Sequence, residues 1–368
     1  MDLFSVALSV TAIVARRRRI RLLRLRSESE LLGRPVRMVR MLASSSPAPP
    51  AFVDILAAAA RIAPYARVTP VMRSHSLDAL AGCELFFKCE NLQRAGAFKF
   101  RGACNAVFAL DDADAARGVV TQSSGNHGAA LALACGLRGL AATVVVPHNA
   151  PKVKLNAIRE YGAKIVHCEV GQASRDAATA QVLADTGGAL VHPFNDPRVI
   201  AGQGTAALEL LAEAPDLDCV IAPVSGGGLL SGTALAAHGV AAARGRAIAV
   251  FGAEPEGAAD AHDSLRSGER ITGRPVDTVC DGLRAELGTL TFPILQQHLD
   301  AILVIDDAHT IEAMRLLWER SKLVVEPSSA IALAAVLRHR ERFAGRRVGV
   351  VLSGGNVDLD DLPWRMRA

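Results

Sequence analysis

The sequence predicts an α/β protein whose parallel sheets are covered by helices on both faces. Three observations support this prediction. Short β-branched segments alternate with helical segments, glycine-rich turns follow several of the strands, and the composition is globular, with 50% of the 368 residues hydrophobic and 21% charged. Aromatic residues contribute only 4%, so we expect a core of Ala, Val, Leu and Ile. In sheets of this kind, ligands bind beyond the carboxyl ends of the strands.

Residues 1–50 differ in character from the rest of the chain. They hold 10 Arg, no Lys and 3 acidic residues, a net charge of +7, which leaves 31 basic and 34 acidic residues, a net −3, for the remainder. The apolar run Leu3–Ala15 is too short to span a bilayer, and its arginines follow it, whereas a signal peptide carries its positive charge first. Residues 1–48 therefore fit either a plastid or mitochondrial transit peptide or an extension upstream of a cytoplasmic enzyme that starts at Met38 or Met41.

The charge and cysteine content of the remainder exclude several classes of protein. A nearly neutral body offers no basic surface for nucleic acid, and we expect neither nucleic acid nor a membrane as a partner. The seven cysteines include no C-x-x-C pair. They therefore predict neither a zinc site nor a disulfide framework, and they favour a reducing compartment.

The regular pattern begins near residue 53. An Ala-rich helix, Val53–Ile62, precedes the apolar segment Glu84–Lys88. The segments GVVTQ, AATVVVP and AKIVHC then predict strands, and between them NHGAALALACGL and PKVKLNAIREYG predict helices that end at Gly. The same alternation returns in the strands DCVIAPV, RAIAVFGAEP and RVGVVL and in the helix LLSGTALAAHGVAAA.

The turn after the strand GVVTQ has the composition of an anion site. Ser123, Ser124, Gly125 and Asn126 would place backbone N–H groups and hydroxyls at the N-terminus of the next helix, which suits a carboxylate. The alternative is ordinary N-capping by Ser or Asn. We favour the anion site, because two serines, a glycine, an asparagine and His127 together exceed what capping requires.

Two later turns combine serine with glycine. Gly226–Gly228 would let backbone amides approach a phosphate closely, although their spacing matches neither a dinucleotide fingerprint nor a Walker loop. Such a run of glycines is also common in simple turns. Ser353 ends the last predicted strand and precedes two glycines, so it is either a turn residue or a neutral hydroxyl that faces a ligand.

An acidic loop and a single lysine complete the candidates. Glu254 and Asp260, with a loop carbonyl, would suit a hard cation such as Mg²⁺ or Ca²⁺, and the alternative is a solvated acidic loop. Lys99 lies between two phenylalanines, just before a predicted helix over residues 101–110. Burial would lower its pKa, and a neutral amine can form a Schiff base. The alternative is a lysine whose stem covers apolar surface while its amine stays in water.

Five motifs together carry a family resemblance. AGAFKFRGACNA, SSGNHG, SGGG, EPSSA and LSGGNVD occur in this order between about Val53 and Leu362. The sequence thereby resembles the fold-type II pyridoxal-phosphate (PLP) enzymes, and within them serine racemase and the short serine/threonine dehydratases. The resemblance implies two three-layer, tryptophan synthase β-like α/β domains with the cofactor in the cleft between them. The large domain would comprise residues 49–115 and 196–368, and the small substrate-binding domain residues 116–195.

The resemblance also implies a role for each motif residue. Lys99 would hold PLP as a Schiff base and act as the base on one face of the cofactor, and Ser124 would be the acid/base on the other face. Further cofactor contacts would come from Phe98, Asn126, Ser225, Gly226, Gly227, Gly228, Leu229 and Ser353. The substrate carboxylate would be bound by Ser123, Ser124, Asn126 and His127, and a divalent cation (Mg²⁺, Ca²⁺ or Mn²⁺) by Glu254, Asp260 and the carbonyl of Ala258.

These assignments predict a function. Ser353 cannot protonate the pyridine nitrogen as an aspartate would, so the cofactor would be a weaker electron sink. We therefore expect a homodimeric serine racemase that also eliminates water from serine or threonine, giving ammonia and a keto acid, pyruvate from serine. A nucleotide such as ATP as effector is left open. The alternatives are a β-replacement synthase similar to cysteine synthase, which the acidic loop disfavours, and a non-catalytic amino-acid- or nucleotide-binding homologue.

Overall fold

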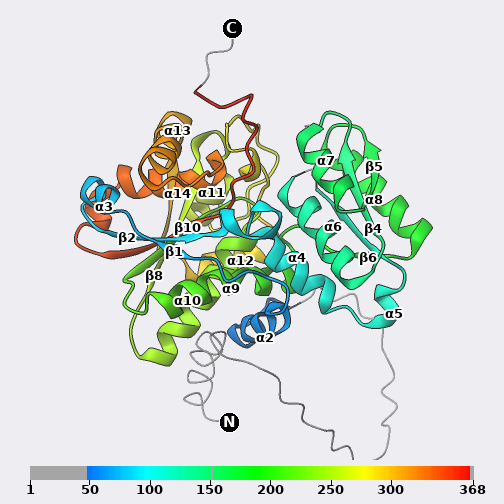
Figure 1. Cartoon of the computed structure of the whole chain (residues 1–368), viewed down its shortest axis with the longest axis horizontal. Coiled ribbons are helices and arrows are strands. Elements are labelled where there is room, and N and C mark those ends of the chain that lie inside the picture. Colours follow the sequence, from blue (N-terminus) through cyan, green and yellow to red (C-terminus); the bar gives the residue numbers. More distant parts are fainter. Residues whose placement is uncertain (1–47, 124, 151, 365–368) are drawn as a thin grey trace, which may run out of the picture. The chain divides into compact units, whose positions relative to one another are not determined.

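The computed structural model describes residues 48–123, 125–150 and 152–364. These residues form a six-stranded sheet and a four-stranded sheet with helices around both (Figure 1). The predicted N-terminal extension and its targeting signal lie almost wholly outside the described residues. No helix in the described ranges is long and apolar enough to cross a membrane.

The six-stranded sheet is parallel except at one edge. In spatial order it contains β1 (Val71–Met72), β2 (Glu84–Cys89), β10 (Arg347–Leu352), β7 (Cys219–Pro223), β8 (Ala249–Pro255) and β9 (Ala301–Ile305). Only β1 runs antiparallel to its neighbour. Because the other five strands are parallel, the turns that follow them emerge at one edge.

Helices cover both faces of this sheet, as the alternation of strands and helices predicts. Along β2, Leu85 and Phe87 pack in one buried cluster, and Phe86 packs in another. The first face is covered by α3 (His75–Ala81), α13 (Asp307–Leu316) and α14 (Pro327–Arg338). The second is covered by α2 (Phe52–Ile62), α9 (Pro197–Glu213) and α10 (Gly228–Arg244).

The four-stranded sheet is parallel throughout. Its strands, in spatial order, are β5 (Lys164–Cys168), β4 (Ala142–Pro147), β3 (Val119–Gln122) and β6 (Ala189–Leu190). The helices α6 (Asn126–Arg138) and α7 (Lys152–Glu160) pack on one face, and α8 (Gln172–Thr186) packs on the other. All four strands fall within the predicted small domain, whose boundaries at residues 116 and 195 stay a prediction.

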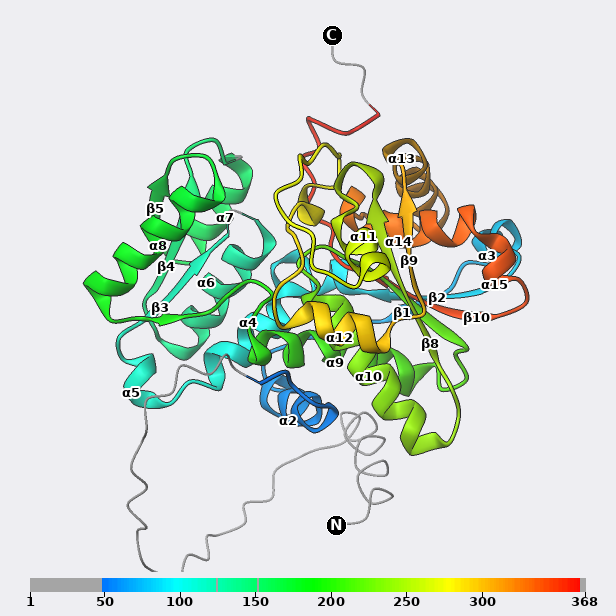
Figure 2. The ribbon, with the colours of Figure 1, turned by 180° about the vertical axis from the view of Figure 1, so that it is seen from behind.

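The remaining elements connect the two sheets and complete the larger one. They are α4 (Lys99–Phe108), α5 (Asp112–Ala115), α11 (Asp260–Ser267), α12 (Thr291–His298), α15 (Arg340–Phe343) and a π-helical turn (Leu317–Ser321). Helix α4 begins two residues earlier than the sequence predicts, at Lys99 itself. It packs against α6 of the smaller sheet and α9 of the larger one, and both views show it between them (Figures 1 and 2).

Glycines bring three helices into very close contact. A Cβ atom on Gly202 of α9 would lie 2.6 Å from the Cα of Gly102 in α4. On the other side of α9, a Cβ on Gly232 of α10 would lie 2.5 Å from the nitrogen of Gly204. Both distances are shorter than real Cβ contacts, and the neighbouring atoms are backbone, so larger residues would force the helices apart. These glycines therefore fix the spacing between α4 and α10.

We expect Gly202→Ala to lower the free energy of unfolding by about 1–3 kcal/mol, the usual range for overpacking. Gly136→Ala is the matched control, because this exposed glycine of α6 has only one neighbour, the Tyr161 carbonyl oxygen, 3.7 Å from an added Cβ. Gly136→Ala should raise the free energy of unfolding by roughly 0.5–1 kcal/mol, because alanine has a higher helix propensity than glycine. Urea unfolding of both variants measures the difference, and equal stabilities would contradict the close helix contact.

Candidate active site

Most of the candidate residues lie at the carboxyl edge of the six-stranded sheet, and residues 123–127 follow β3 of the four-stranded sheet. The neighbouring strands β2, β10, β7 and β8 lead into the Lys99 segment, Ser353, the Ser225–Gly228 turn and the acidic loop, respectively. The expectation that the glycine-rich turns lie at strand ends is therefore confirmed. Segments far apart in the sequence thus form one continuous edge.

Backbone contacts join Lys99 to the Ser353 turn. Ala97 and Gly354 form an isolated antiparallel bridge. The N–H of Phe98 donates to the carbonyl of Ser353 at 2.9 Å. Ser353 is 3% exposed, and its hydroxyl lies 3.5 Å from the carbonyl of Ser328. Lys99 and the serine predicted to face the pyridine nitrogen are therefore held next to each other.

The Lys99 amine lies in a partly dry environment. Its Nζ donates to the carbonyl of Pro193 at 3.1 Å and lies 5.1 Å from the centroid of the Phe98 ring. Burial lowers the pKa of Lys99 to about 8, although the negative charge of Glu326 acts in the opposite direction. Near neutral pH a useful fraction of this amine is thus uncharged, which nucleophilic chemistry requires.

Two neutral histidines lie near Lys99. His127 is 1% exposed, and neither ring nitrogen has a hydrogen-bond partner. Burial, together with the charge of Lys99, holds the pKa of His127 well below its usual value. Burial and Lys99 also lower the pKa of His192 to about 4. The Nδ1 of His192 accepts the N–H of Asn195 at 3.0 Å, so its proton is on Nε2.

The first turn of α6 is tied to the start of α14. The Nδ2 of Asn126 lies 2.9 and 3.2 Å from the two carboxylate oxygens of Glu326, which is 4% exposed. The Oδ1 of Asn126 accepts from Asn356 at 2.9 Å. The hydroxyl of Ser123 accepts the N–H of Gly125 at 3.4 Å. Ser124, the predicted second acid/base, lies outside the described residues.

The glycine turn precedes α10, a helix of 17 residues. Gly227 has a φ of +87°, which requires glycine. The ring of Phe194 rests on Gly226, where an added Cβ would lie 2.4 Å from it. The hydroxyl of Ser225 is already used by the backbone of Ala285 at 3.0 Å. Any phosphate contact from Ser225 therefore rests on its backbone N–H.

The rest of this turn has the features of an anion site. Leu229, the remaining predicted contact, is 5% exposed within the first turn of α10. The N-terminus of a helix presents backbone N–H groups and a positive dipole end, which favour a phosphate. The donor set therefore fits a phosphate ester.

The acidic loop brings Glu254 and Asp260 together. Glu254 is 1% exposed and accepts the N–H groups of Ala261 and His262 at 2.8 and 2.7 Å. Burial raises the pKa of Glu254 to about 8 and that of Asp260 to about 6. The Oδ2 of Asp260 is buried without a hydrogen-bond partner. Two buried carboxylates, one of them with an oxygen that lacks a hydrogen-bond partner, fit a cation. The 3₁₀ turn that ends at Ala258 lies between them in the sequence.

Within the described residues, no group of three or more His, Cys, Asp or Glu side chains is arranged to hold a metal. The predicted set has two carboxylates and a backbone carbonyl, so it stays a prediction. All seven cysteines are buried and unpaired.

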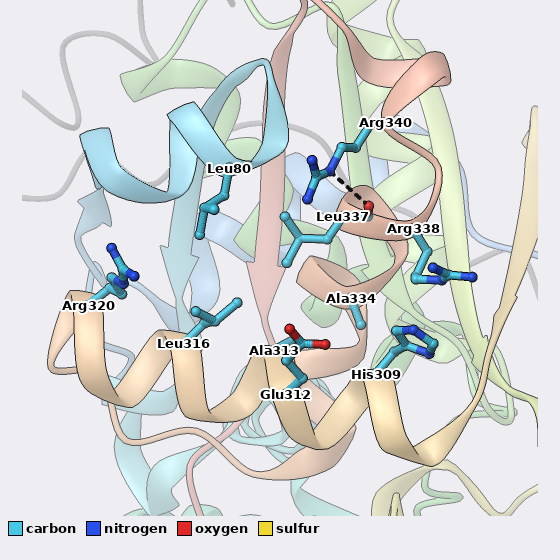
Figure 3. A pocket seen from close by; sticks show the side chains of 10 residues that line it. All are labelled: Leu80, His309, Glu312, Ala313, Leu316, Arg320, Ala334, Leu337, Arg338 and Arg340. Atoms are coloured by element: carbon cyan, nitrogen blue, oxygen red, sulfur yellow. Dashed lines mark hydrogen bonds between the residues drawn. The ribbon is translucent and has the colours of Figure 1, made fainter.

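A surface pocket of about 360 Å³ lies elsewhere, among α3, α13, α14 and α15 (Figure 3). Leucine and alanine side chains alternate there with the charged residues Glu312, Arg320, Arg338 and Arg340. None of the site residues described above lines it. The pocket is therefore separate from the Lys99 site.

The sequence did not identify two parts of the site. Glu326 belongs to the EPSSA motif, which by itself predicts no role for it, and no motif marks the segment His192–Asn195. That segment follows β6 at the carboxyl end of a parallel strand and reads HPFN. Its position is the signal that could have identified it, because ligands bind beyond the carboxyl ends of parallel strands whether or not glycines follow.

Comparisons with known proteins agree with this geometry. The family model "Pyridoxal-phosphate dependent enzyme" matches residues 62–354. A β-hydroxyaspartate dehydratase of Paracoccus denitrificans is 50% identical over 315 residues, which cover 86% of this chain and 99% of the relative. A serine racemase of Arabidopsis thaliana is 49% identical over 307 residues, covering 82% and 92%.

A solved structure shows the same fold. The serine racemase of maize superposes with a TM-score of 0.82 at 46% identity and covers 84% of this chain and 95% of its own. Fold, motif order and identity agree over nearly the whole described region. The chain therefore belongs to the fold-type II PLP-dependent enzymes, in the family of serine racemases and hydroxyaspartate dehydratases, and is a racemase or ammonia-lyase.

Proposed function

We propose that this chain racemises serine and also eliminates water from serine or threonine. The observation that carries the proposal is the junction of Lys99 with Ser353 through the Ala97–Gly354 bridge. When bound, PLP would supply an electron sink for the substrate Cα, and a serine at its ring nitrogen makes that sink shallower than an aspartate would. A shallower sink favours proton exchange and β-elimination over transamination.

Each part of the site would do one task. Lys99 would hold the cofactor through Nζ and, once released by substrate, move the proton at Cα. Ser225, Gly226, Gly227 and Gly228 would bind the phosphate at the N-terminus of α10. Ser123, Asn126 and His127 would bind the substrate carboxylate. Ser124 would hold the proton on the opposite side of Cα.

A second candidate substrate is β-hydroxyaspartate. The relative from Paracoccus denitrificans carries that name at 50% identity. His127 and His192 both lie near Lys99, and the Nε2–H of His192 is a donor beyond those assigned to the first carboxylate. Both candidates lose a β-hydroxyl, so the two proposals differ in the substrate side chain and not in the roles of the residues.

Incubation with L-serine and Mg²⁺ is expected to yield both D-serine and pyruvate from the same tube. Parallel incubations with L-threonine, β-hydroxyaspartate, and O-acetylserine plus sulfide rank the alternative substrates. An absorbance band at about 410–420 nm that borohydride abolishes identifies the bound cofactor. Absence of both products together with rapid sulfide incorporation would overturn the proposal in favour of a β-replacement synthase.

Ser124→Ala should lower racemisation by roughly 10²- to 10⁴-fold, the usual contribution of an acid/base group, and leave more of the elimination intact. Lys99→Ala should abolish both reactions. Initial rates of D-serine and pyruvate formation measure the two effects separately. Full racemisation by Ser124→Ala would show that the two-base assignment is wrong.

The apo-protein should capture PLP faster as pH rises through about 8, because the neutral Lys99 amine is the nucleophile and its pKa is lowered from 10.5 to about 8. Glu326→Gln should move this midpoint to lower pH, because it removes the negative charge that favours the charged amine. Growth of the visible band in stopped-flow mixing gives both midpoints. A midpoint above 10, or an upward shift in the variant, would contradict this account of the site.

Mg²⁺ should raise the melting temperature by a few degrees at saturating concentration, because a ligand at a hundred times its Kd adds about 2.7 kcal/mol to stability. Asp260→Asn should lose this response. Asp263→Asn is the matched control, because Asp263 is a nearby acidic residue that pairs with Arg274 and is not in the predicted ligand set. Loss of the response in both variants, or in neither, would contradict the assignment of Asp260 as a ligand.

A further inference from the structure

Four charged side chains are buried together beside the Lys99 helix, outside the contacts assigned above. Arg101 lies in the first turn of α4, and its side chain is fully buried. Glu90 and Lys88 are also fully buried, and Glu209 of α9 is 20% exposed. Full burial of charged groups is rare in proteins unless they are paired.

Arg101 holds two carboxylates at once. Its Nε and one terminal nitrogen lie 2.7 and 2.8 Å from the two oxygens of Glu90. Its two terminal nitrogens each lie 2.8 Å from an oxygen of Glu209. Both contacts are bidentate, a geometry that a planar guanidinium can make and an ammonium group cannot.

The other members close the network. The Nζ of Lys88 donates to Glu209 at 2.6 Å and to the carbonyl of Thr69 at 2.7 Å. The hydroxyl of Thr69 donates to Glu90 at 2.5 Å. Burial alone would raise the pKa of Glu209, but Arg101 and Lys88 together hold it below its usual value. The two cations and two anions therefore balance one another.

This network joins α4 to the strand β2 and to α9 at the end of the helix where Lys99 lies. The N-cap position of α4 is Phe98, which provides no side-chain hydrogen bond to the first turn. Helix ends without such a cap need other contacts to stay fixed. Arg101 is two residues from Lys99 and supplies them in two directions, toward Glu90 and toward Glu209.

We propose that Arg101 is a positioning residue, which fixes the first turn of α4 and thereby the place of the Lys99 amine. The proposal rests on the proposed role of Lys99. Buried ion pairs contribute little net stability, so stability alone explains such a network poorly. Arg101 acts through geometry, because its charge is balanced by two carboxylates.

The decisive variant is Arg101→Lys, which keeps the positive charge and loses both bidentate contacts. We expect kcat for serine to fall roughly 10- to 100-fold, as a displacement of about 1 Å would cause, with little change in KM. A displaced amine would be more exposed to water, and burial is what lowers the pKa of Lys99. The pH midpoint of PLP capture should then rise from about 8 toward 10.5.

Lys88→Met is the matched control. Lys88 shares the burial of Arg101 and its contact with Glu209, but it lies on β2 and its hydrogen bonds go to Glu209 and the Thr69 carbonyl, neither of which belongs to α4. We expect a lower melting temperature for this variant, with kcat and the pH midpoint both close to wild type. A role in stability alone would affect both variants in the same way.

The outcomes separate the proposed role of Lys99 from the positioning role of Arg101. If wild type forms no borohydride-sensitive band, the proposed role of Lys99 fails. If wild type forms the band and Arg101→Lys keeps wild-type kcat and midpoint, or Lys88→Met loses as much kcat, the positioning role is overturned. If Arg101→Lys does not fold, Glu209→Gln is measured in its place. A lower kcat and a raised pH midpoint of PLP capture would support the positioning role of Arg101, and wild-type values of both would overturn it.

Discussion

The close approach of helix α9 to α4 on one side and to α10 on the other sets the geometry of this site. Gly102 and Gly202 meet at one contact, and Gly204 and Gly232 meet at the other. Because backbone touches backbone at both contacts, neither helix can shift without moving α9. Lys99 begins α4 and the glycine turn begins α10. The Lys99 amine and the predicted phosphate site are therefore held by one packed unit of three helices, which fixes their positions relative to each other.

Around this unit, burial and charge act in opposite directions on the same amine. Burial favours the neutral form of Lys99, and Glu326 favours the charged form. His127 and His192 are both kept neutral by burial, so they add hydrogen-bonding groups without adding positive charge. Glu326 also binds Asn126 and thereby connects the electrostatics of the amine to the helix start expected to hold the substrate carboxylate.

Local patterns predicted most of the strands, the helices α2, α4, α6, α7 and α10, and the order of the motifs, because strand–helix alternation and glycine turns are recognisable in short segments of sequence. They did not mark the strands β1, β6 and β9 or the remaining helices. The start of α4 was misplaced by two residues, since Phe98 provides no side-chain cap to mark it. Glu326 and the Arg101 network could not be predicted in this way. Asn126 meets Glu326 across 200 residues and Arg101 meets Glu209 across 108, and only tertiary packing reveals such pairs.

The ring of Phe194 resting on Gly226 has a consequence for how this family can vary. The two positions are sterically coupled, although 31 residues separate them in the sequence. A side chain at position 226 has room only if residue 194 is small, whereas a bulky ring at position 194 demands glycine at position 226. Homologues should therefore exchange these residues as a pair, and a chain that changed only one of them would carry a steric defect at its anion site.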